Sequence, residues 1–405
     1  MKTVWIINHY AGNNKVGLEY RHFFIAKELE RQNINVFIIS SSYTHLLHKE
    51  VKIRGESELT IYDGIPYLWI KTPKYIGNKL SRFRNMIFFS YKLQRIFKKI
   101  DAPKPDFVIA SSPHPFSILN GYFISKYYKA KFIFEERDVW PMAIKELLGA
   151  NRFHPIVVIF QWLEDFAYKK SDLVLSPLVN LEKNISLRKI KHKNFFYLPN
   201  GILIKDMEEL LKSNVNIDKY IPKEKFLIGF AGTVGASNCV DILLKSAKKL
   251  KNTNIGFIII GDGDLFDEMK KYAEDEKLNN VYMLGKKDKK STIKILDRCD
   301  VLYNGSPKSL LYSYGLSCIK LPEYMYLSKY IINAVDVSND IVEVANCGST
   351  IDSENVEELA FEIKKLSETD KDKLDEFGIR GKNYIENNLT YPFLVKSFIE
   401  KLDEL

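Results

Sequence analysis

The sequence predicts an α/β protein of two doubly wound domains, each a parallel sheet covered by helices on both faces. Its 405 residues are more than one hydrophobic core usually serves, so two domains are expected. Short apolar runs recur along the chain, each followed by a longer amphipathic stretch, and this series starts again near residue 200. We therefore expect domains over residues 1–200 and 201–388 that face each other across a deep cleft. A helix over about 389–405 is expected to pack back on the first domain.

The first domain is predicted from the alternation of strand and helix patterns. Residues Glu19–Arg31 and Ile118–Tyr128 carry apolar side chains at helical spacing. Short apolar runs of strand length surround them, which favours parallel strands joined by helices. The expected strands are Val4–Asn8, Val36–Ser40, Phe107–Ala110, Phe132–Glu135 and Leu173–Ser176.

The second domain begins after the turn Pro199-Asn200-Gly201, where proline and glycine interrupt the apolar run Phe195–Leu198. The apolar pattern from Tyr391 to Leu402 predicts the terminal helix. The strands expected between them are Phe226–Ala231, Gly256–Ile260, Val281–Leu284, Val301–Tyr303 and Tyr330–Asn333.

The composition excludes several classes of protein. Apolar residues make up 46% and charged residues 27%, which is typical of a globular chain rather than a disordered one. No apolar run approaches the roughly 20 residues of a membrane-spanning helix, and the start of the chain lacks signal-peptide features. The four cysteines form no C-x-x-C pair and no histidine cluster accompanies them. We therefore expect reduced thiols, no metal and a cytoplasmic location.

The net charge of +9 is concentrated in one segment. From Lys71 to Ile100 there are nine basic residues and no acidic one, interleaved with aromatic residues. Such a stretch suits an anionic membrane surface, and charge reversal at Lys79, Arg82 and Arg84 should then weaken binding to anionic vesicles. A solvated basic helix that packs its aromatic residues inward explains the pattern equally well. No RNA-binding, zinc or helix-turn-helix motif accompanies the charge, which argues against nucleic-acid binding.

Candidate site residues follow the strands of the first domain, because open α/β sheets bind ligands beyond the carboxyl ends of their strands. His114 follows Phe107–Ala110 between two prolines, and a free histidine pKa of about 6.5 suits proton transfer. A purely structural histidine is the alternative. After the next strand come Glu135, Arg137 and Asp138. A carboxylate here could orient His114, act as a base or hold acceptor hydroxyls; alternatively, an Arg137–Asp138 or Arg137–glutamate pair fixes the loop.

Glycines follow the strands of the second domain. Gly232 and Gly235 allow backbone N–H groups to approach a phosphate, although tight strand–helix packing explains them as well. The sequence Asp262-Gly263-Asp264 has the form of a cation-binding D-x-D motif. It follows an apolar strand inside a βα unit, so we expect turn chemistry there instead.

The most informative segment covers residues 314–325. Gly315 leads a loop into a short helix that carries Lys320 and Glu323 at i, i+3 spacing. Free N–H groups at a helix start with a lysine nearby can hold a diphosphate, and a carboxylate one turn later can bind both hydroxyls of a ribose. A Lys320–Glu323 surface ion pair is the alternative.

Several of these segments together resemble the retaining family-four glycosyltransferases of the GT-B fold. The closer resemblance is to the subgroup that builds O-antigen and capsule, including N-acetylfucosamine transferases. The individual motifs are short, but their order and spacing are specific and cover nearly the whole chain. The matching segments are FIFEERDVWP (132–141), LPNG (198–201), GTVG (232–235), IIGDG (259–263) and KLPEYM (320–325).

The resemblance implies two facing Rossmann-like domains, with a nucleotide-sugar donor held by the second, an acceptor held by the first, and no metal or other cofactor. By position, Glu323 corresponds to the glutamate that binds the ribose, and His114 to a histidine beside the sugar. Arg137 is a possible phosphate or acceptor contact. The remaining matches are Gly232 and Gly235 near the diphosphate and Gly285 and Lys286 at the base pocket.

Three positions depart from the family pattern. A glutamate expected at position 315 is replaced by Gly315. The arginine and lysine that often grip the diphosphate appear as Thr233 and Asn238. The diphosphate must then be neutralised by another group, with Lys320 and Arg137 as the candidates.

The predicted activity is that of a retaining hexosyl or N-acetylhexosaminyl transferase of enzyme class 2.4. The donor is expected to be a UDP-sugar and the acceptor a lipid-linked saccharide, in the synthesis of O-antigen or capsule at the inner face of the cell membrane. Front-face attack is favoured, with the donor phosphate accepting the proton and His114 orienting the sugar; Glu135 and Asp138 are the other catalytic candidates. A UDP-sugar 2-epimerase of the same fold and a catalytically silent nucleotide-sugar-binding scaffold are the alternatives.

Overall fold

The computed structural model describes residues 1–13, 15–17, 19–47, 49–75, 80–149, 151, 153–316, 318–337 and 339–405. Lys79, one of the basic residues singled out for membrane contact, and Ser317 of segment 314–325 lie outside the described residues. The chain divides into two compact units. Unit 1 comprises Met1–Pro199 and Tyr391–Leu405, and unit 2 comprises Asn200–Thr390.

Unit 1 contains an eight-stranded sheet with the strand order β3-β4-β2-β1-β5-β6-β7-β8. Strand β3 pairs antiparallel with β4, and the other neighbours pair in parallel. The central strands β1 and β5 are buried at every position, which explains their continuous apolar sequences. The strands are β1 (Thr3–Ile7), β2 (Asn35–Ser41), β3 (Ser57–Tyr62), β4 (Ile65–Ile70), β5 (Phe107–Ser111), β6 (Lys131–Glu135), β7 (Leu173–Ser176) and β8 (Phe195–Tyr197).

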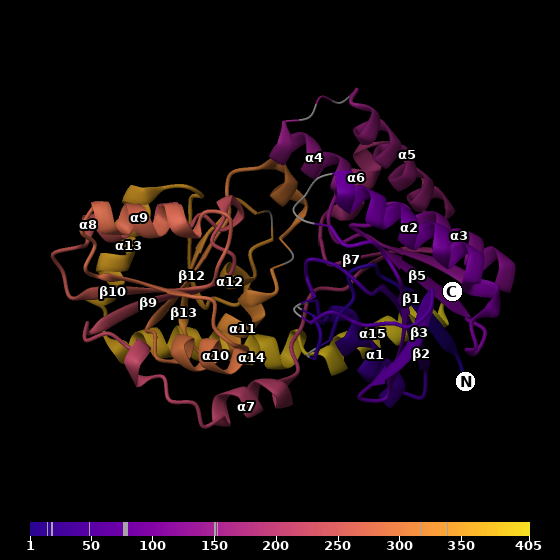
Figure 1. The fold of residues 1–405 in the computed structure, drawn as a ribbon. Helices are drawn as coiled ribbons and strands as arrows, with labels where there is room; N and C mark the ends of the chain where they lie inside the picture. The colour runs from indigo at the N-terminus through magenta and orange to yellow at the C-terminus, as the bar shows by residue number, and fades with distance from the viewer. Residues whose placement is uncertain are drawn as a thin grey trace. The chain divides into compact units, whose positions relative to one another are not determined.

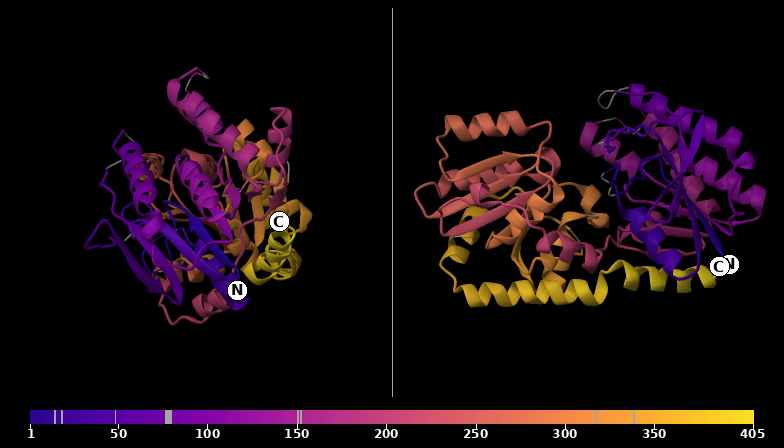
Figure 2. Two further views of the ribbon diagram at one scale, coloured as in Figure 1. Left: turned by 90° about the vertical axis from the view of Figure 1, so that its right-hand side faces the viewer. Right: turned by 60° about the horizontal axis from the view of Figure 1, so that its bottom comes forward.

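Helices cover both faces of this sheet, with α2, α3 and α5 on one side and α1 and α15 on the other (Figure 1). The two ends of the sequence lie together in unit 1, where Lys2 Nζ is 2.5 Å from Asp403 (Figure 2). Helix α15 packs on α1 through the rings of Tyr391 and Phe24, whose centroids are 5.2 Å apart. The helices are α1 (Arg21–Arg31), α2 (Leu80–Ile96), α3 (Ser117–Tyr128), α4 (Trp140–Leu148), α5 (Pro155–Lys170), α6 (Leu181–Leu187) and α15 (Tyr391–Asp403).

Unit 2 contains a six-stranded sheet with the order β11-β10-β9-β12-β13-β14, in which neighbouring strands pair in parallel. Figure 1 shows α8, α9 and α13 on one face of this sheet and α10, α11 and α14 on the other. The strands are β9 (Phe226–Ala231), β10 (Ile255–Ile260), β11 (Val281–Gly285), β12 (Val301–Gly305), β13 (Tyr330–Ala334) and β14 (Gly348–Ile351). The helices are α7 (Ile204–Lys212), α8 (Val240–Lys249), α9 (Phe266–Asp275), α10 (Lys289–Asp297), α11 (Lys320–Tyr326), α12 (Ile341–Val344), α13 (Val356–Ser367) and α14 (Lys371–Asn388).

The predicted alternation of strands and helices is confirmed, and every run predicted as a strand forms one. Three further strands, β3, β4 and β14, were not predicted. In β3, Leu59 and Ile61 alternate with more buried neighbours and are themselves exposed, so this edge strand lacks the continuous apolar run of a strand covered on both faces. Among the helices of the described residues, none combines the length and hydrophobicity required to span a membrane.

Candidate functional site

The strand ends of unit 2 carry two glycines that are packed backbone to backbone. Strand β9 ends at Ala231 and β10 at Ile260, and Gly232 and Gly261 follow them. A Cβ atom at Gly261 would lie 1.8 Å from the carbonyl oxygen of Gly232, and Gly261 has a φ of +142° that other residues rarely adopt. Glycine at position 261 is therefore required for the two loops to approach each other.

Lys320, the first residue of α11, directs its ammonium group to the loop after β9. Its Nζ donates to Asn238 Oδ1 at 2.7 Å and lies 4.5 Å from the centroid of the Phe230 ring. A methyl group at Gly232 would be 3.8 Å from the same nitrogen, so Lys320, Asn238 and Gly232 form one cluster. Burial lowers the pKa of Lys320 below its usual 10.5. This arrangement is suited to binding an anionic group through the cation and the neighbouring backbone.

Glu323 lies one turn further along α11 and turns away from Lys320. Lys289 Nζ, from the first residue of α10, donates to both of its carboxylate oxygens, at 2.6 Å to Oε1. The Glu323 side chain is 17% exposed, so a ligand can still reach it. Because Lys320 and Glu323 have different partners, the structure does not show the surface ion pair that was the alternative for these residues.

Gly235 lies in the loop after β9, and Gly315 lies in the loop that leads to α11. Gly235 has an extended backbone with a φ of −159°, and a Cβ atom there would meet only the Thr233 methyl group, at 3.7 Å. The space beside Gly235 is therefore open. Gly315 follows the short helix η4 (Leu310–Tyr314), and its φ of +116° favours glycine at this turn into α11.

Gly285 and Lys286 lie at the end of β11. The carbonyl oxygen of Gly285 accepts a hydrogen bond from the Gly261 N–H at 3.1 Å, which links the ends of β10 and β11. Lys286 is exposed. Asp262 Oδ1 accepts from the Gly263 N–H at 2.8 Å, a local turn contact of the kind predicted for the D-x-D segment. Within the described ranges, no group of three or more His, Cys, Asp or Glu side chains is placed to hold a metal ion.

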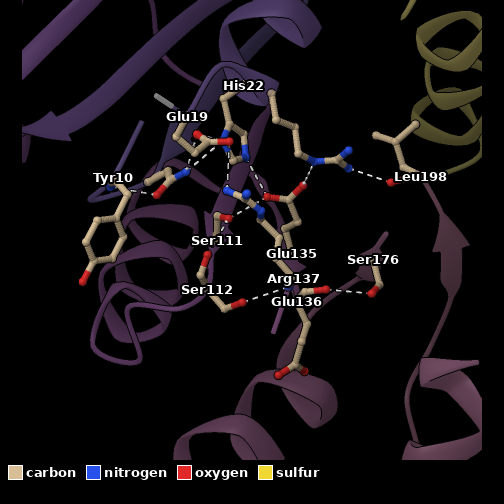
Figure 3. A network of polar contacts seen from close by, with 12 residues as sticks. Tyr10, Glu19, His22, Ser111, Ser112, Glu135, Glu136, Arg137, Ser176 and Leu198 are labelled. Atoms are coloured by element: carbon tan, nitrogen blue, oxygen red, sulfur yellow. Dashed lines mark hydrogen bonds and ion pairs between the residues drawn. The ribbon is translucent and has the colours of Figure 1, made fainter. Parts of the chain in front are cut away.

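A buried network of charged residues occupies the strand ends of unit 1 (Figure 3). Its centre is Glu135, the last residue of β6, which has no exposed surface. Its carboxylate accepts from Arg21 Nε at 2.9 Å and from Ser111 Oγ at 2.6 Å, and its Oε2 lies 2.6 Å from His22 Nε2. Burial alone would raise the pKa of Glu135, but the charges of His22 and Arg21 hold it well below its usual value. These contacts favour a structural role over the predicted role as a base.

His22 joins the two carboxylates of the network. Its Nδ1 is 3.3 Å from Glu19 Oε2, while its Nε2 faces Glu135. Burial acts to lower the pKa of His22, but the two carboxylates outweigh it and raise that pKa above 6.5. His22 therefore bridges Glu19 and Glu135.

Arg21 ties this network to a second segment of the family resemblance. Its guanidinium donates to the carbonyl oxygens of Leu198 and Pro199 at 2.7 and 2.8 Å. The segments 132–141 and 198–201, which are far apart in sequence, are thus connected through one buried side chain.

Arg137 and Asp138 lie closer to solvent. Arg137 Nη1 is 3.0 Å from Glu19 Oε1, and its side chain is 14% exposed. Its backbone N–H donates to Ser112 Oγ at 2.8 Å. Asp138 is exposed. The loop-fixing pair considered for Arg137 is formed with Glu19, before α1, rather than with a residue of its own loop.

His114 is completely buried, and both of its ring nitrogens are engaged. Nδ1 accepts from the Ser117 N–H and Nε2 faces the Met86 carbonyl oxygen, both at 2.9 Å. Burial lowers the pKa of His114 to about 4, so the ring is neutral near pH 7. Its ring stacks on that of His9, which lies two residues after the end of β1, and the two ring centroids are 4.8 Å apart. This placement favours the structural alternative over proton transfer to a substrate.

Four residues of these clusters were not among the candidates predicted from the sequence: Glu19, Arg21, His22 and Lys289. The strand-end rule, applied to β1, points to the chain after residue 7 and thus toward the first three, which are buried and lie just before α1 or in its first turn. Lys289 had no such signal, because its contact with Glu323 joins helices 34 positions apart in the chain.

Residues 214–384, all within unit 2, match the sequence model of the family described as glycosyl transferases group 1. An uncharacterized glycosyltransferase of Methanocaldococcus jannaschii is 24% identical over 242 residues, which are 59% of this chain and 60% of that protein. The alignment thus spans less than two thirds of this relative. WbjE of Pseudomonas aeruginosa, named a probable glycosyltransferase, is 21% identical over 298 residues, 71% of this chain and 69% of WbjE.

Solved structures with the same fold cover the whole chain. Sucrose-phosphate synthase from Thermosynechococcus elongatus superposes with a TM-score of 0.70 at 11% identity, over 100% of this chain and 99% of that one. HepE from Anabaena, solved in complex with UDP, has a TM-score of 0.66 at 13% identity, over 100% of both chains. At these identities the likeness concerns the fold, which is GT-B. The chain thus has the GT-B fold, and its residues 214–384 are similar to the group 1 glycosyl transferases.

Proposed function

We propose that this protein transfers a hexosyl or N-acetylhexosaminyl group from a UDP-sugar to a lipid-linked saccharide with retention of configuration, in the synthesis of O-antigen or capsule. In this proposal, unit 2 binds the donor and unit 1 the acceptor. The observation that carries the proposal is the cluster of Lys320, Asn238 and Gly232 at the carboxyl edge of the unit 2 sheet, with Glu323 one turn away.

The carboxylate of Glu323 is the proposed ribose site. Lys289 already holds it in one orientation while leaving part of it exposed. Each of its oxygens can accept one hydrogen bond from a vicinal hydroxyl, and hydrogen bonds to an ionised acceptor are the stronger kind. Gly285 and Lys286, at the adjacent strand end, are the proposed base pocket. The UDP in the HepE structure supports a uridine donor.

Lys320 is the proposed partner of the diphosphate, in place of the basic residues that Thr233 and Asn238 replace. Its hydrogen bond to Asn238 supports this, because the ammonium group reaches the very loop from which those basic side chains are missing. Arg137 is the weaker candidate, since it is paired with Glu19. With a cation and backbone N–H groups at the phosphates, binding is expected without Mg²⁺.

The proposed chemistry is a front-face substitution. The bond from the sugar C1 to the diphosphate oxygen breaks as the bond from C1 to the acceptor oxygen forms on the same face, and the departing phosphate takes the acceptor's proton. Lys320 and the backbone N–H groups stabilise the negative charge that develops on the leaving group. A buried His114 with a pKa of about 4 and two occupied nitrogens supports the phosphate, rather than this histidine, as the proton acceptor.

The test is calorimetric binding of UDP and GDP to the wild type and to Glu323→Ala, with and without Mg²⁺. We expect UDP-selective, Mg²⁺-independent binding that weakens at least tenfold in the variant, since a hydrogen bond to a charged group is worth about 1.5–3 kcal/mol. Glu357→Ala is the matched control, because this α13 glutamate is 79% exposed. Absence of nucleotide binding by a folded sample would overturn the proposal in favour of a catalytically silent protein that scaffolds a membrane assembly. Conversion of a UDP-sugar to its 2-epimer without an acceptor would favour the epimerase.

A further inference from the structure

Three neighbouring helices of unit 1 expose large apolar side chains on one side of the molecule. Helices α2, α3 and α5 lie side by side over the same face of the sheet (Figures 1 and 2). Each carries two or more large apolar residues whose exposed fraction is between 43% and 58%. We call these residues the three-helix patch: Ile87, Phe88 and Tyr91 on α2, Phe123 and Tyr127 on α3, and Val158, Ile159 and Trp162 on α5.

Ring contacts join the three helices beneath the patch. Trp162 of α5 stacks on Phe166, with centroids 5.8 Å apart, and Phe166 contacts Tyr122 of α3 at 5.0 Å. At the other side of α3, Tyr127 contacts Phe97, directly after α2, at 5.3 Å. Scattered exposed apolar residues are common on proteins, but eight large ones on three neighbouring helices indicate an interaction site.

The exposed charges on the same three helices are basic. Segments 80–100, 117–131 and 155–170 contain two acidic residues, of which Glu164 is buried and Asp165 is paired with Arg188. Two of the cations lie directly over patch rings, Lys98 over Tyr127 at 4.7 Å and Arg95 over Tyr91 at 5.7 Å. The exposed basic residues of these segments are Arg84, Arg95, Lys98, Lys99, Lys126, Lys129, Lys131, Lys169 and Lys170.

We propose that the three-helix patch lies flat on an anionic lipid bilayer, with its aromatic and aliphatic side chains in the headgroup region and its lysines and arginines at the lipid phosphates. This inference rests on the proposed function in one respect, because a lipid-linked acceptor is found in a membrane. A basic surface with embedded Trp, Tyr and Phe matches the chemistry of interfacial binding. A protein partner is disfavoured, because lysine is depleted at protein–protein interfaces and abundant here.

In the basic segment 71–100, some aromatic residues pack inward and others are exposed, so each of the two interpretations of its sequence applies to part of it. Tyr75, Phe89 and Phe97 are buried in the core, whereas Phe88 and Tyr91 are exposed. The segment is therefore only one edge of the proposed surface. The residues of α3 and α5 complete it, although neither helix is marked by charge in the sequence.

The position of the tryptophans provides a direct test. Trp5 and Trp69 are buried and Trp140 is partly buried, whereas Trp162 in the patch is 58% exposed. Phosphatidylglycerol–phosphatidylethanolamine vesicles should therefore shift the fluorescence emission to the blue, and phosphatidylcholine vesicles should not. In Trp162→Phe the shift should disappear while co-sedimentation with the vesicles persists. A shift that survives this substitution would overturn the proposed orientation.

Variants with matched controls test which residues bind. Each basic residue near an anionic surface contributes about a fivefold change in partitioning, so the triple variant Lys98→Glu, Lys99→Glu and Lys126→Glu should bind at least a hundredfold more weakly. Phe88→Ser with Tyr91→Ser should weaken binding about tenfold or more. The controls are Phe361→Ser and Lys364→Glu on α13 of unit 2, both exposed, and we expect less than a twofold change.

Donor binding separates this inference from the proposed function. UDP affinity, measured on the same variants, should be unchanged, and urea unfolding followed by the tryptophan fluorescence of unit 1 should show that they are folded. A wild type that binds UDP but no anionic vesicle overturns the membrane surface and leaves the transferase proposal intact. A wild type that binds anionic vesicles but no UDP overturns the transferase proposal and leaves the membrane surface intact. A dimer that the patch variants dissociate, without vesicle binding by the wild type, would overturn the lipid in favour of a second copy of the chain.

Discussion

The strand ends of the two units carry opposite kinds of chemistry. In unit 1 they hold a dense set of charges around Glu135, Arg21 and His22, all without appreciable contact with solvent. In unit 2 they hold glycines and backbone groups, together with Lys320 and Glu323, whose neighbours leave them partly accessible. The charges that look most catalytic in the sequence are thus those most engaged in holding the fold together.

This difference has a physical cause. A buried charge is tolerated only when it is paired and hydrogen-bonded, so the groups of unit 1 have their bonds made with other protein groups. A binding site needs groups that are oriented but not fully satisfied. Lys320, held by the neutral Asn238, and Glu323, held by the half-exposed Lys289, meet this condition. The number of charged residues after a strand is therefore a poorer guide to a ligand site than the number of hydrogen bonds and ion pairs that these residues can still make.

The largest expected effect comes from removing the central charge of unit 1. Glu135→Gln leaves Arg21 and His22 without their buried counter-charge, and breaking a buried pair in this way costs roughly 3–5 kcal/mol. All four tryptophans (Trp5, Trp69, Trp140 and Trp162) lie in unit 1, so urea unfolding followed by tryptophan fluorescence reports on this unit.

Glu323→Gln is the matched comparison for Glu135→Gln. It should leave the fluorescence-detected transition within about 0.5 kcal/mol of the wild type, as surface substitutions usually do. The contrast between the units is refuted if Glu135→Gln unfolds like the wild type and instead abolishes UDP binding.

The second effect concerns the lysine of unit 2. Lys320→Met removes the proposed diphosphate cation while keeping the apolar stem, and UDP affinity should fall by about 10- to 100-fold, the worth of a charge-assisted hydrogen bond. Because burial lowers the pKa of Lys320, wild-type affinity should also decline with rising pH sooner than expected for an exposed lysine. Calorimetry between pH 7 and 10 measures both, with Lys364→Met as the exposed control. Equal affinities for UDP in wild type and Lys320→Met would assign the diphosphate to another residue.

The smallest effect is the pH dependence that His22 imposes on unit 1. Its pKa is raised in the folded state, so its contribution to stability is fully present below the unfolded value of about 6.5 and is lost as pH rises through the folded pKa. The unfolding free energy of the wild type should therefore decrease above pH 6.5, and His22→Gln should flatten this slope. His114, whose pKa is lowered to about 4, reduces the unfolding free energy only as the pH falls below 6.5. The effects of the two histidines therefore appear in different pH ranges. Parallel curves for wild type and His22→Gln above pH 6.5 would show that His22 is not protonated in the network.

Much of the fold could be predicted because strands that are buried on both faces have continuous apolar sequences. Every run predicted on this basis formed a strand, whereas the half-exposed β3, the short β14 and also the largely buried β4 were missed. The site was predicted unevenly. The residues after β9 and at the start of α11 lie together as expected, since parallel strands end at one edge of a sheet. For Glu135 and His114, the sequence predicted the position at a strand end but not the burial.

By itself, the sequence determined the alternation of strands and helices, the residues that follow each strand and the basic character of segment 71–100. The tertiary structure decided which of those residues have free bonding capacity. Arg21 and Glu135 are 114 positions apart, and Lys289 and Glu323 are 34 apart, so no local pattern records either pair. The structure likewise decided that α3 and α5 extend the basic face of α2. Local periodicity specifies which face of an element is buried, but only packing specifies which side chains meet.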